Sequence, residues 1–500
     1  MRTRLAVAVS GLALVAIAAS GAGAATLSPA HLAPAQAAAA GPRVTLSPAS
    51  GPPTTTVAVS GSGFGAYEGV DLYFGTTDLA LAGTGRTGSF GPVSIHIPAS
   101  AIPGTAWVSA EGRRTRLFAQ TPFTVRTNWD QFHFSANHEG VNPYENVLSP
   151  ATVTGLDVNW IFATGNLVSS PAVVNGLVYI TSYDDSVYAV NASTGAKRWS
   201  FKTGRSIYAS PAVVNGLVYV VSYDDRVYAL NAATGAERWS FNTGTAEAHT
   251  PVVANGLVYV GSFDGKLYAL NAATGAKRWT FTTGGVVYPP TVADGIVVAS
   301  SQDGKVYALN ASTGAKRWSF AVASSGGYSA PAIADGVVYV TATTGKIYAL
   351  NLLSGGGLLW SFNLGGIAAT SSPAVANGVA YVGSPDGNVY ALNARTGAEL
   401  WSFNTGGPVY NSAPAVANGV VYVGSNDGKV FALNASTGAE LWNFTTGGVV
   451  FNGPAVANGV VYVGSGDNNL YAFGLRGGLP APTRPRPGNL HPNYGLREQR

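Results

Sequence analysis

The stretch that decides the fold is residues 414–448, which read PAVANGVVYVGSNDGKVFALNASTGAELWNFTTGG. Similar stretches start at prolines spaced 39–42 residues apart, namely Pro171, Pro211, Pro251, Pro290, Pro331, Pro373, Pro414 and Pro454. Within each copy, turn dipeptides separate four runs of β-branched, aliphatic and aromatic residues. Asn-Gly and Asp-Gly favour type I′ hairpins because both central residues adopt a positive φ. Four strands in each copy predict an all-β chain built from the blades of a β-propeller.

A tryptophan motif indicates how the ring of blades closes. Trp-x-Phe occurs once for each copy, at Trp160, Trp199, Trp239, Trp279, Trp318, Trp360, Trp401 and Trp442. The first motif precedes the first proline copy, and the last copy ends at Phe473-Gly474 without one. We therefore predict eight blades, with residues 156–163 supplying the outer strand of the last blade and leaving no open edge. Each tryptophan is predicted to pack between neighbouring blades, because a single blade cannot bury both of its faces alone.

Residues 189–199, AVNASTGAKRW, resemble the tryptophan-docking motif of PQQ-binding-like (quinoprotein-type) propellers. Asn191 stands where that motif usually has Asp. Variants of the motif recur at 229–239, 269–279, 308–318, 391–401 and 432–442. The copy before Trp360 carries one extra residue. The resemblance covers residues 156–474 and implies a PQQ-like propeller over that range.

The resemblance implies two different functions. A PQQ-dependent dehydrogenase of alcohols or sugars would hold PQQ on the propeller axis, with Ca²⁺ on carboxylate and amide ligands and an Asp base. Such enzymes often carry a vicinal disulfide and long insertions, whereas this chain has no cysteine and nearly uniform repeats. We therefore expect no PQQ, no calcium and no enzymatic activity, and interpret the chain as a binding scaffold. The dehydrogenase is the alternative, and a structural cell-surface protein is the second alternative.

Aspartates recur in the second turn of most copies and suggest two roles. Several converging carboxylates would hold a cation. Asp-Gly and Asp-Asn also suit tight hairpins, which makes a turn role the simpler interpretation. Thr343-Thr344 replaces the aspartate in the fifth copy, so a ring of carboxylates would be interrupted. The candidate cation turns are Asp184, Asp224, Asp264, Asp303, Asp386, Asp427 and Asp467. No other metal site is predicted.

The crossovers that join Trp-x-Phe to the next proline vary between copies. Because strands alternate in direction, these crossovers share one face with the Asp turns, and the Asn-Gly and Thr-Gly hairpins share the other. Loops on a rigid scaffold usually carry function. Aromatic rings near the axis would stack on sugar rings, grip an extended peptide, or merely plug the channel. The candidate ligand face is Tyr208, His249, Tyr288, Tyr328, Tyr410 and Phe451. The expected partner is an extracellular protein or glycan.

The N-terminal third differs from the repeats. Residues 1–24 combine MRTR, an apolar run and Ala22-Gly-Ala24, which is typical of a signal peptide and predicts secretion. Residues 25–42 are an Ala/Pro-rich linker. Short alternating runs over 43–126, with LSPASG at 46–51 and VSGSGF at 59–64, resemble an IPT/TIG-type immunoglobulin-like domain. Residues 83–88 match Gly-x-Gly-x-x-Gly, but no helical period follows, so no dinucleotide site is expected.

Composition limits the remaining possibilities. The chain has 64 Gly, 28 Pro and only 10% charged residues, which excludes a coiled coil. Without cysteine it has no disulfide framework and no thiol nucleophile. The basic excess lies in the first residues and in the Pro-rich tail 475–500, predicted to be flexible, so we expect no nucleic-acid partner. No later apolar run reaches membrane length, and a monomer is expected. The lead-in 127–155, with His133, His138 and Trp129, is expected to pack aromatics onto the propeller.

Overall fold

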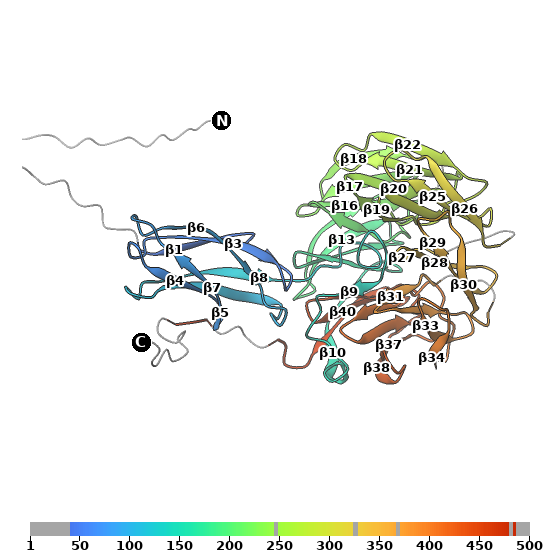
Figure 1. Cartoon of the computed structure of the whole chain (residues 1–500). Helices are drawn as coiled ribbons and strands as arrows, with labels where there is room; N and C mark the ends of the chain where they lie inside the picture. Colours follow the sequence, from blue (N-terminus) through green and yellow to red (C-terminus); the bar gives the residue numbers. More distant parts are fainter. Residues whose placement is uncertain (1–40, 245–248, 324–328, 367–370, 480–483, 487–500) are drawn as a thin grey trace, which may run out of the picture. The chain divides into compact units, whose positions relative to one another are not determined.

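The structure is a computed structural model that describes residues 41–244, 249–323, 329–366, 371–479 and 484–486 (Figure 1). Strands form nearly all of its regular structure, and the helical part of these ranges is one short 3₁₀ turn, η1 (Val153–Gly155). The predicted all-β class is therefore confirmed. No helix in these ranges has the length and apolar character needed to cross a membrane. The predicted signal peptide lies outside the described residues.

Two sheets form the part of the chain before the repeats. One contains β1 (Arg43–Ser47), β3 (Thr56–Ser62) and β6 (Phe90–His96). The other contains β2 (Ser50–Gly51), β8 (Phe118–Val125), β7 (Gly104–Gly112), β4 (Gly69–Phe74) and β5 (Thr77–Gly83). Buried side chains from both sheets, such as Val57, Leu72 and Phe123, share one core. The Gly-x-Gly-x-x-Gly segment is a loop from β5 to β6, with no helix after it.

The repeats fold into antiparallel four-stranded sheets in sequence order. Their first strands are β11 (Ala172–Val174), β15 (Ala212–Val214), β19 (Val252–Ala254), β23 (Thr291–Ala293), β27 (Ala332–Ala334), β31 (Ala374–Ala376), β35 (Ala415–Ala417) and β39 (Ala455–Ala457). Their second strands are β12 (Leu177–Ser182), β16 (Leu217–Ser222), β20 (Leu257–Gly261), β24 (Ile296–Ser300), β28 (Val337–Ala342), β32 (Val379–Gly383), β36 (Val420–Gly424) and β40 (Val460–Gly464).

The outer half of each sheet follows the same scheme. The third strands are β13 (Ser186–Asn191), β17 (Arg226–Asn231), β21 (Lys266–Asn271), β25 (Lys305–Asn310), β29 (Lys346–Asn351), β33 (Asn388–Asn393), β37 (Lys429–Asn434) and β41 (Asn469–Leu475). The fourth strands are β14 (Lys197–Lys202), β18 (Glu237–Asn242), β22 (Lys277–Thr282), β26 (Lys316–Ala321), β30 (Leu358–Asn363), β34 (Glu399–Asn404) and β38 (Glu440–Thr445), with β10 (Leu156–Ala163) beside β41.

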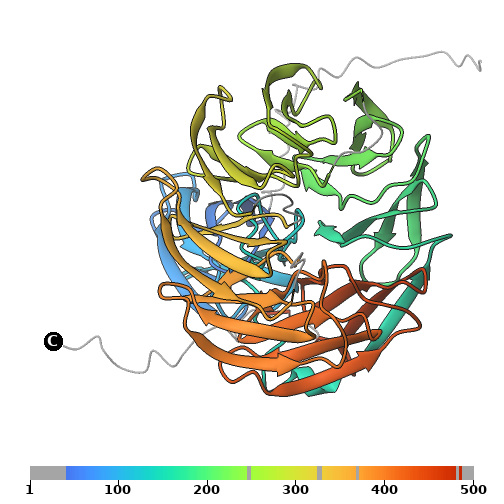
Figure 2. The ribbon, with the colours of Figure 1, turned by 90° about the vertical axis from the view of Figure 1, so that its right-hand side faces the viewer.

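These sheets follow one another around a ring, which makes the repeated part a β-propeller (Figure 2). Each first strand contacts the first strand of the next sheet, from β11 through to β39, and β39 contacts β11 again. The ends of the chain meet where β10 pairs antiparallel with β41, with Leu156 opposite Leu475 and Ala163 opposite Asn469. The repeat register predicted this pairing for residues 156–163, and that prediction is confirmed. The pairing covers the edge of β41.

Turn chemistry explains why these strands form hairpins. Asn175 and Gly176 adopt φ of 54° and 77°, the positive values that the type I′ prediction requires. The corresponding Asn or Asp has a positive φ in every later sheet, at Asn215, Asn255, Asp294, Asp335, Asn377, Asn418 and Asn458. The backbone N–H of Ala192 donates to Gly176 O at 3.0 Å, so the Asn-Gly and Thr-Gly turns lie on the same face. We call this the hairpin face.

Each Trp-x-Phe indole joins two sheets. Trp199 Nε1 donates to the carbonyl of Ala232 in the next sheet at 2.9 Å, and its ring lies over Gly235. A Cβ at Gly235 would lie 2.6 Å from that ring, and φ there is +74°, so only glycine suits the position. The other indoles donate in the same way: Trp160 to Ala192, Trp239 to Ala272, Trp279 to Ala311, Trp318 to Leu352, Trp360 to Ala394, Trp401 to Ala435 and Trp442 to Leu156.

Candidate functional site

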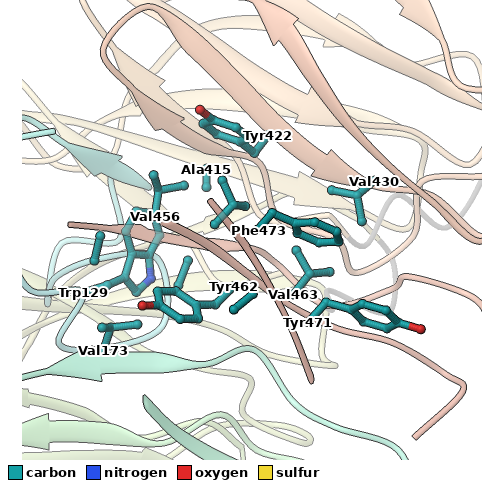
Figure 3. Close-up of a cluster of buried hydrophobic side chains, with 14 of the residues drawn as sticks. Trp129, Val173, Ala415, Tyr422, Val430, Val456, Tyr462, Val463, Tyr471 and Phe473 are labelled. Atoms are coloured by element: carbon teal, nitrogen blue, oxygen red, sulfur yellow. The ribbon is translucent and has the colours of Figure 1, made fainter. Parts of the chain in front are cut away.

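The segment 127–142 runs along the inner edges of the first strands, and we call it the axial belt. Trp129 and Val173 exchange two backbone hydrogen bonds of 2.7 and 2.8 Å, and Trp129 is buried among Val173, Val456 and Tyr462 (Figure 3). Further along, Val213 N, in the middle of β15, donates to Asp130 O of the belt at 2.8 Å. The belt therefore satisfies backbone groups that an inner edge strand would otherwise expose.

The belt continues around the ring in the order of the sheets. The Gln131 side chain mimics a strand, because its Oε1 accepts from Val253 N at 2.7 Å and its Nε2 donates to Val253 O at 3.1 Å. The next contacts are Val292 N to Ala136 O, Ile333 N to Asn137 O, Val375 N to Glu139 O and Val416 N to Gly140 O, at 2.7–2.9 Å. β9 (Val141–Asn142) then pairs with β35, and Asn142 Nδ2 donates to Val456 O at 2.8 Å. Every sheet thus has a contact with the belt.

Two histidines are buried within the belt. His133 is 2% exposed and His138 is fully buried. The ring of Phe132 stacks on His133 at 4.7 Å, and His138 Nδ1 lies 3.0 Å from Thr291 Oγ1. Burial lowers the pKa of His133 to about 4 and that of His138 to about 3, so both rings are neutral at physiological pH. Among the residues that the structure describes, His, Asp and Glu side chains form no group that would hold a metal.

A cavity of about 170 Å³ lies beside the belt, and we call it the axial cavity. Phe132 of the belt lines it, together with Tyr208, His249 and Tyr288 from three successive crossovers. The sequence placed these three in the candidate ligand face, and the structure brings them together. Tyr328 lies outside the described residues. Tyr410 and Phe451 do not line the cavity, and their neighbours Asn411 and Asn452 do.

The prolines that open each repeat explain this difference. Tyr208 and Asn411 are each the third residue before a proline. His249, Tyr288 and Asn452 are each the second. The prediction selected aromatic residues and therefore named Tyr410, which precedes the cavity residue Asn411 by one position. An alignment of the crossovers on their prolines would have found both asparagines.

Hydroxyl groups directly before the prolines connect neighbouring sheets at the cavity wall. Thr250 Oγ1 accepts from Ser210 N at 3.1 Å, Ser372 Oγ from Ala330 N at 3.0 Å, and Ser170 Oγ from Gly453 N at 2.9 Å. All three hydroxyl-bearing residues line the cavity. No described group accepts the hydroxyl proton of Thr250, Ser372 or Ser170. The oxygens of these three hydroxyls in the wall therefore already accept a backbone N–H.

His249 lines the same site with its ring. Its ring lies 4.9 Å from the Tyr288 ring and 5.1 Å from the Phe263 ring. The Nε2 atom is shielded from solvent and has no hydrogen-bond partner in the described part of the chain. Burial lowers the pKa of His249 to about 4, which keeps the ring neutral. The described lining residues include no Asp, Glu, Lys or Arg, so the cavity is polar but uncharged.

The Asp turns lie with the crossovers but use their carboxylates locally. Asp184 Oδ1 accepts from Ser186 N at 3.1 Å, and its Oδ2 accepts from Tyr188 Oη at 2.8 Å and Gly165 N at 2.7 Å. Asp224, Asp264, Asp303, Asp386 and Asp467 accept from their own tyrosines at 2.5–2.7 Å. Asp427 has no such tyrosine, because Phe431 occupies the equivalent position. Lys429 Nζ lies 3.2 Å from Asp427 Oδ2. These contacts give the carboxylates a structural role, and cation binding by the turns stays a prediction.

Three solved structures are similar to this chain in fold. The BamB of Moraxella catarrhalis is 21% identical, with a TM-score of 0.56, over 65% of this chain and 99% of that chain. Quinohemoprotein alcohol dehydrogenase from Comamonas testosteroni is 18% identical, with a TM-score of 0.61, over 72% and 82%. The computationally designed Ika8 protein is 20% identical, with a TM-score of 0.58, over 63% and 98%. These likenesses show the fold alone.

The family comparison adds information beyond the fold. No match was found among curated proteins. The family described as outer membrane protein assembly factor BamB matches residues 151–283, 226–356, 282–413 and 385–480. The overlapping matches cover more than half of the chain and all of its repeats. The protein therefore belongs to this BamB family of PQQ-like β-propellers.

Proposed function

We propose that this chain is an exported, eight-bladed propeller behind an immunoglobulin-like module, and that it serves as a non-catalytic binding scaffold. The order of the four-stranded sheets and the contact of β39 with β11 support the blade number. The two sheets with a shared core support the immunoglobulin-like assignment. Export rests on the sequence pattern of residues 1–24. The partner is an extracellular protein or glycan that binds the face carrying the crossovers and Asp turns, which we call the crossover face.

The axial cavity is the observation that carries this proposal. Ligand sites are typically concave, with aromatic walls and a few placed polar groups. Tyr208, Tyr288 and His249 supply the aromatic walls, and the pre-proline hydroxyls supply the polar groups. The belt residue Phe132 also lines the cavity, and the belt contacts every sheet. Because most of the described lining residues belong to the crossovers, we expect the ligand to bind at the crossover face.

The residues of the cavity also bear on the cofactor that the resemblance implies. PQQ would supply quinone redox chemistry, and it carries carboxylates that need cationic partners when buried. Ca²⁺ takes about six to eight oxygen ligands, commonly including Asp or Glu. The described lining residues offer neither a carboxylate nor a cation, so they do not fit the PQQ–calcium pair. This mismatch supports the non-catalytic reading over the dehydrogenase.

Capture on arrays of glycans and extracellular proteins tests the proposal. The full chain is compared with Tyr208→Ser, which removes an aromatic wall, and with Leu353→Ser as a matched control. Leu353 is 65% exposed in a turn whose neighbour Leu352 donates to Gly336 O on the hairpin face. We expect capture that Tyr208→Ser abolishes and Leu353→Ser preserves, with both variants melting as the wild type does. Absence of any capture, or oxidation of an alcohol or sugar after addition of PQQ and Ca²⁺, would overturn the proposal.

A further inference from the structure

We propose that the axial cavity binds one neutral sugar ring, either as a free monosaccharide or as the terminal unit of a glycan. This inference rests on the proposed function and names the ligand class of the same site. It follows from three properties of the described cavity wall: the polarity of its hydrogen-bonding groups, its aromatic surfaces and its size.

The hydroxyls of the wall select a ligand with acceptor oxygens. Thr250, Ser372 and Ser170 each accept a backbone N–H from the neighbouring sheet. A hydroxyl whose oxygen is engaged in this way still has a proton to donate. The Asn452 side chain offers an acceptor and not a donor, because its Nδ2 donates to Val168 O and its Oδ1 is left to accept a hydrogen bond. A ligand that matches this wall both accepts and donates, as a sugar hydroxyl does.

The aromatic side chains complement the other surface of a sugar ring. A pyranose has an apolar C–H face, which packs on aromatic rings while its edge hydroxyls point toward polar groups. Tyr208, His249 and Tyr288 provide such rings from adjacent crossovers. The contribution of His249 is its ring, because its Nε2 atom is shielded from solvent and therefore from a ligand hydroxyl.

The charge and the volume of the cavity further restrict the class of ligand. The described wall has no charged side chain, so burying a charged ligand would cost more than burying a neutral one. An engineered cavity of about 150 Å³ holds one benzene ring, so a volume of about 170 Å³ suits a single six-membered ring and not a fully buried disaccharide.

Calorimetric titration of the full chain with neutral monosaccharides and their methyl glycosides tests the inference. The probes are glucose, galactose, mannose and N-acetylglucosamine, with glucuronate and glucosamine as charged counterparts. We expect at least one neutral probe to bind, and its charged counterpart to bind at least tenfold more weakly. A methyl glycoside that binds as well as the free sugar identifies a terminal glycan unit, whereas loss of binding on methylation identifies a free monosaccharide.

Tyr208→Leu supplies the matched variant, because it keeps an apolar wall and removes the aromatic ring. Losing this ring contact is expected to lower affinity about tenfold. Leu353→Ser on the hairpin face is the control and leaves affinity unchanged, and thermal melting verifies that both variants fold. The inference is overturned if no neutral monosaccharide binds, if charged sugars bind equally well, or if Tyr208→Leu has no effect. If array capture persists in any of these cases, the proposed function survives and only the sugar assignment fails.

Discussion

Trp442 donates its indole N–H to the backbone carbonyl of Leu156 at 3.2 Å, across 286 positions of the sequence. The other Trp-x-Phe indoles make the same bond to the next sheet within 32–34 positions. The closing contact uses a residue of the fourth strand β10, which lies opposite Leu475 of the third strand β41. Tyr179 and five equivalent tyrosines donate to the carbonyl that the indole uses, whereas Val298 takes this place in one sheet and the Tyr422 hydroxyl has no partner in the described structure.

The indole contacts predict a large loss of stability on truncation. Trp279 packs over Gly314 and donates to Ala311 O at 3.0 Å. Trp279→Ala removes both interactions and is expected to lower the free energy of unfolding by about 3 kcal/mol. Trp279→Phe keeps most of the packing and is expected to cost only about 1–2 kcal/mol. Urea denaturation followed by circular dichroism measures both changes, and equal losses would show that packing contributes little.

The belt predicts a specific effect at Gln131. This side chain is 4% exposed and makes two hydrogen bonds with the backbone of Val253. Gln131→Ala leaves both backbone groups without partners and is expected to cost about 2–4 kcal/mol. In Gln131→Glu the ionised carboxylate can accept from Val253 N but cannot donate. Its protonated form regains an O–H donor, so the variant is expected to be less destabilised at low pH. Chemical denaturation at two pH values tests this, and an unchanged midpoint for Gln131→Ala would contradict the belt's role.

The buried histidines predict that stability falls in acid. The folded-state pKa values of His133 and His138 are lowered from 6.5 to about 4 and about 3. Between pH 6.5 and these values the unfolded chain binds more protons, so stability decreases as pH falls. The loss is about 2 kcal/mol for each histidine between pH 6.5 and about 5. Asp130 acts oppositely, because burial raises its pKa to about 6 and its contribution is lost as pH rises from 3.8.

Glutamine substitutions isolate this effect. His133→Gln with His138→Gln is expected to flatten the pH dependence of the melting temperature between about pH 5 and 7. His96→Gln on β6 is the matched control, because no contact with the belt involves that residue. A wild-type protein whose melting temperature is unchanged at pH 5 would show that these rings are not held neutral.

The repeat that contains Phe431 lacks a contact that six other repeats have, which predicts a stabilising change. Tyr228 and Tyr268 donate to Asp224 and Asp264 at 2.6 Å, but Phe431 occupies the equivalent place beside Asp427. Phe431→Tyr is expected to add this hydrogen bond and stabilise the chain by about 1 kcal/mol. Phe403→Tyr, on β34 of the neighbouring sheet, adds a hydroxyl to the ring that contacts Phe431 and serves as the control. A lower melting temperature for Phe431→Tyr would mean that the pocket cannot accept the hydroxyl.

The sequence predicted the features that repeat and missed those that do not. Trp160 and the Pro-opened copies predicted the pairing of β10 with β41, because each copy specifies the same turns and packing. β5 carries a weaker strand signal, because its sequence, TDLALAG, is poor in β-branched residues. The belt was missed for another reason. Its bonds are mostly backbone to backbone, so residues such as Ala136 and Asn137 carry no signature of them.

The candidate site was predicted only in part, for a related reason. Tyr208, His249 and Tyr288 were identified from the variation among crossovers, and they do line one cavity. Thr250 and Ser372 were not identified, because a hydroxyl before a proline is common and its role depends on an N–H in the next sheet. Phe132 comes from a segment outside the repeats, and its place beside His249 arises only when the ring closes.

Amide hydrogen exchange of the full chain, with and without its captured ligand, locates the binding site. The ligand is expected to slow exchange in the crossovers around Tyr208, His249 and Asn411, with no change in the hairpin turns around Asn175 and Asn215. Protection confined to the hairpin face, or to the strands before Thr127, would place the binding site elsewhere and contradict the claim.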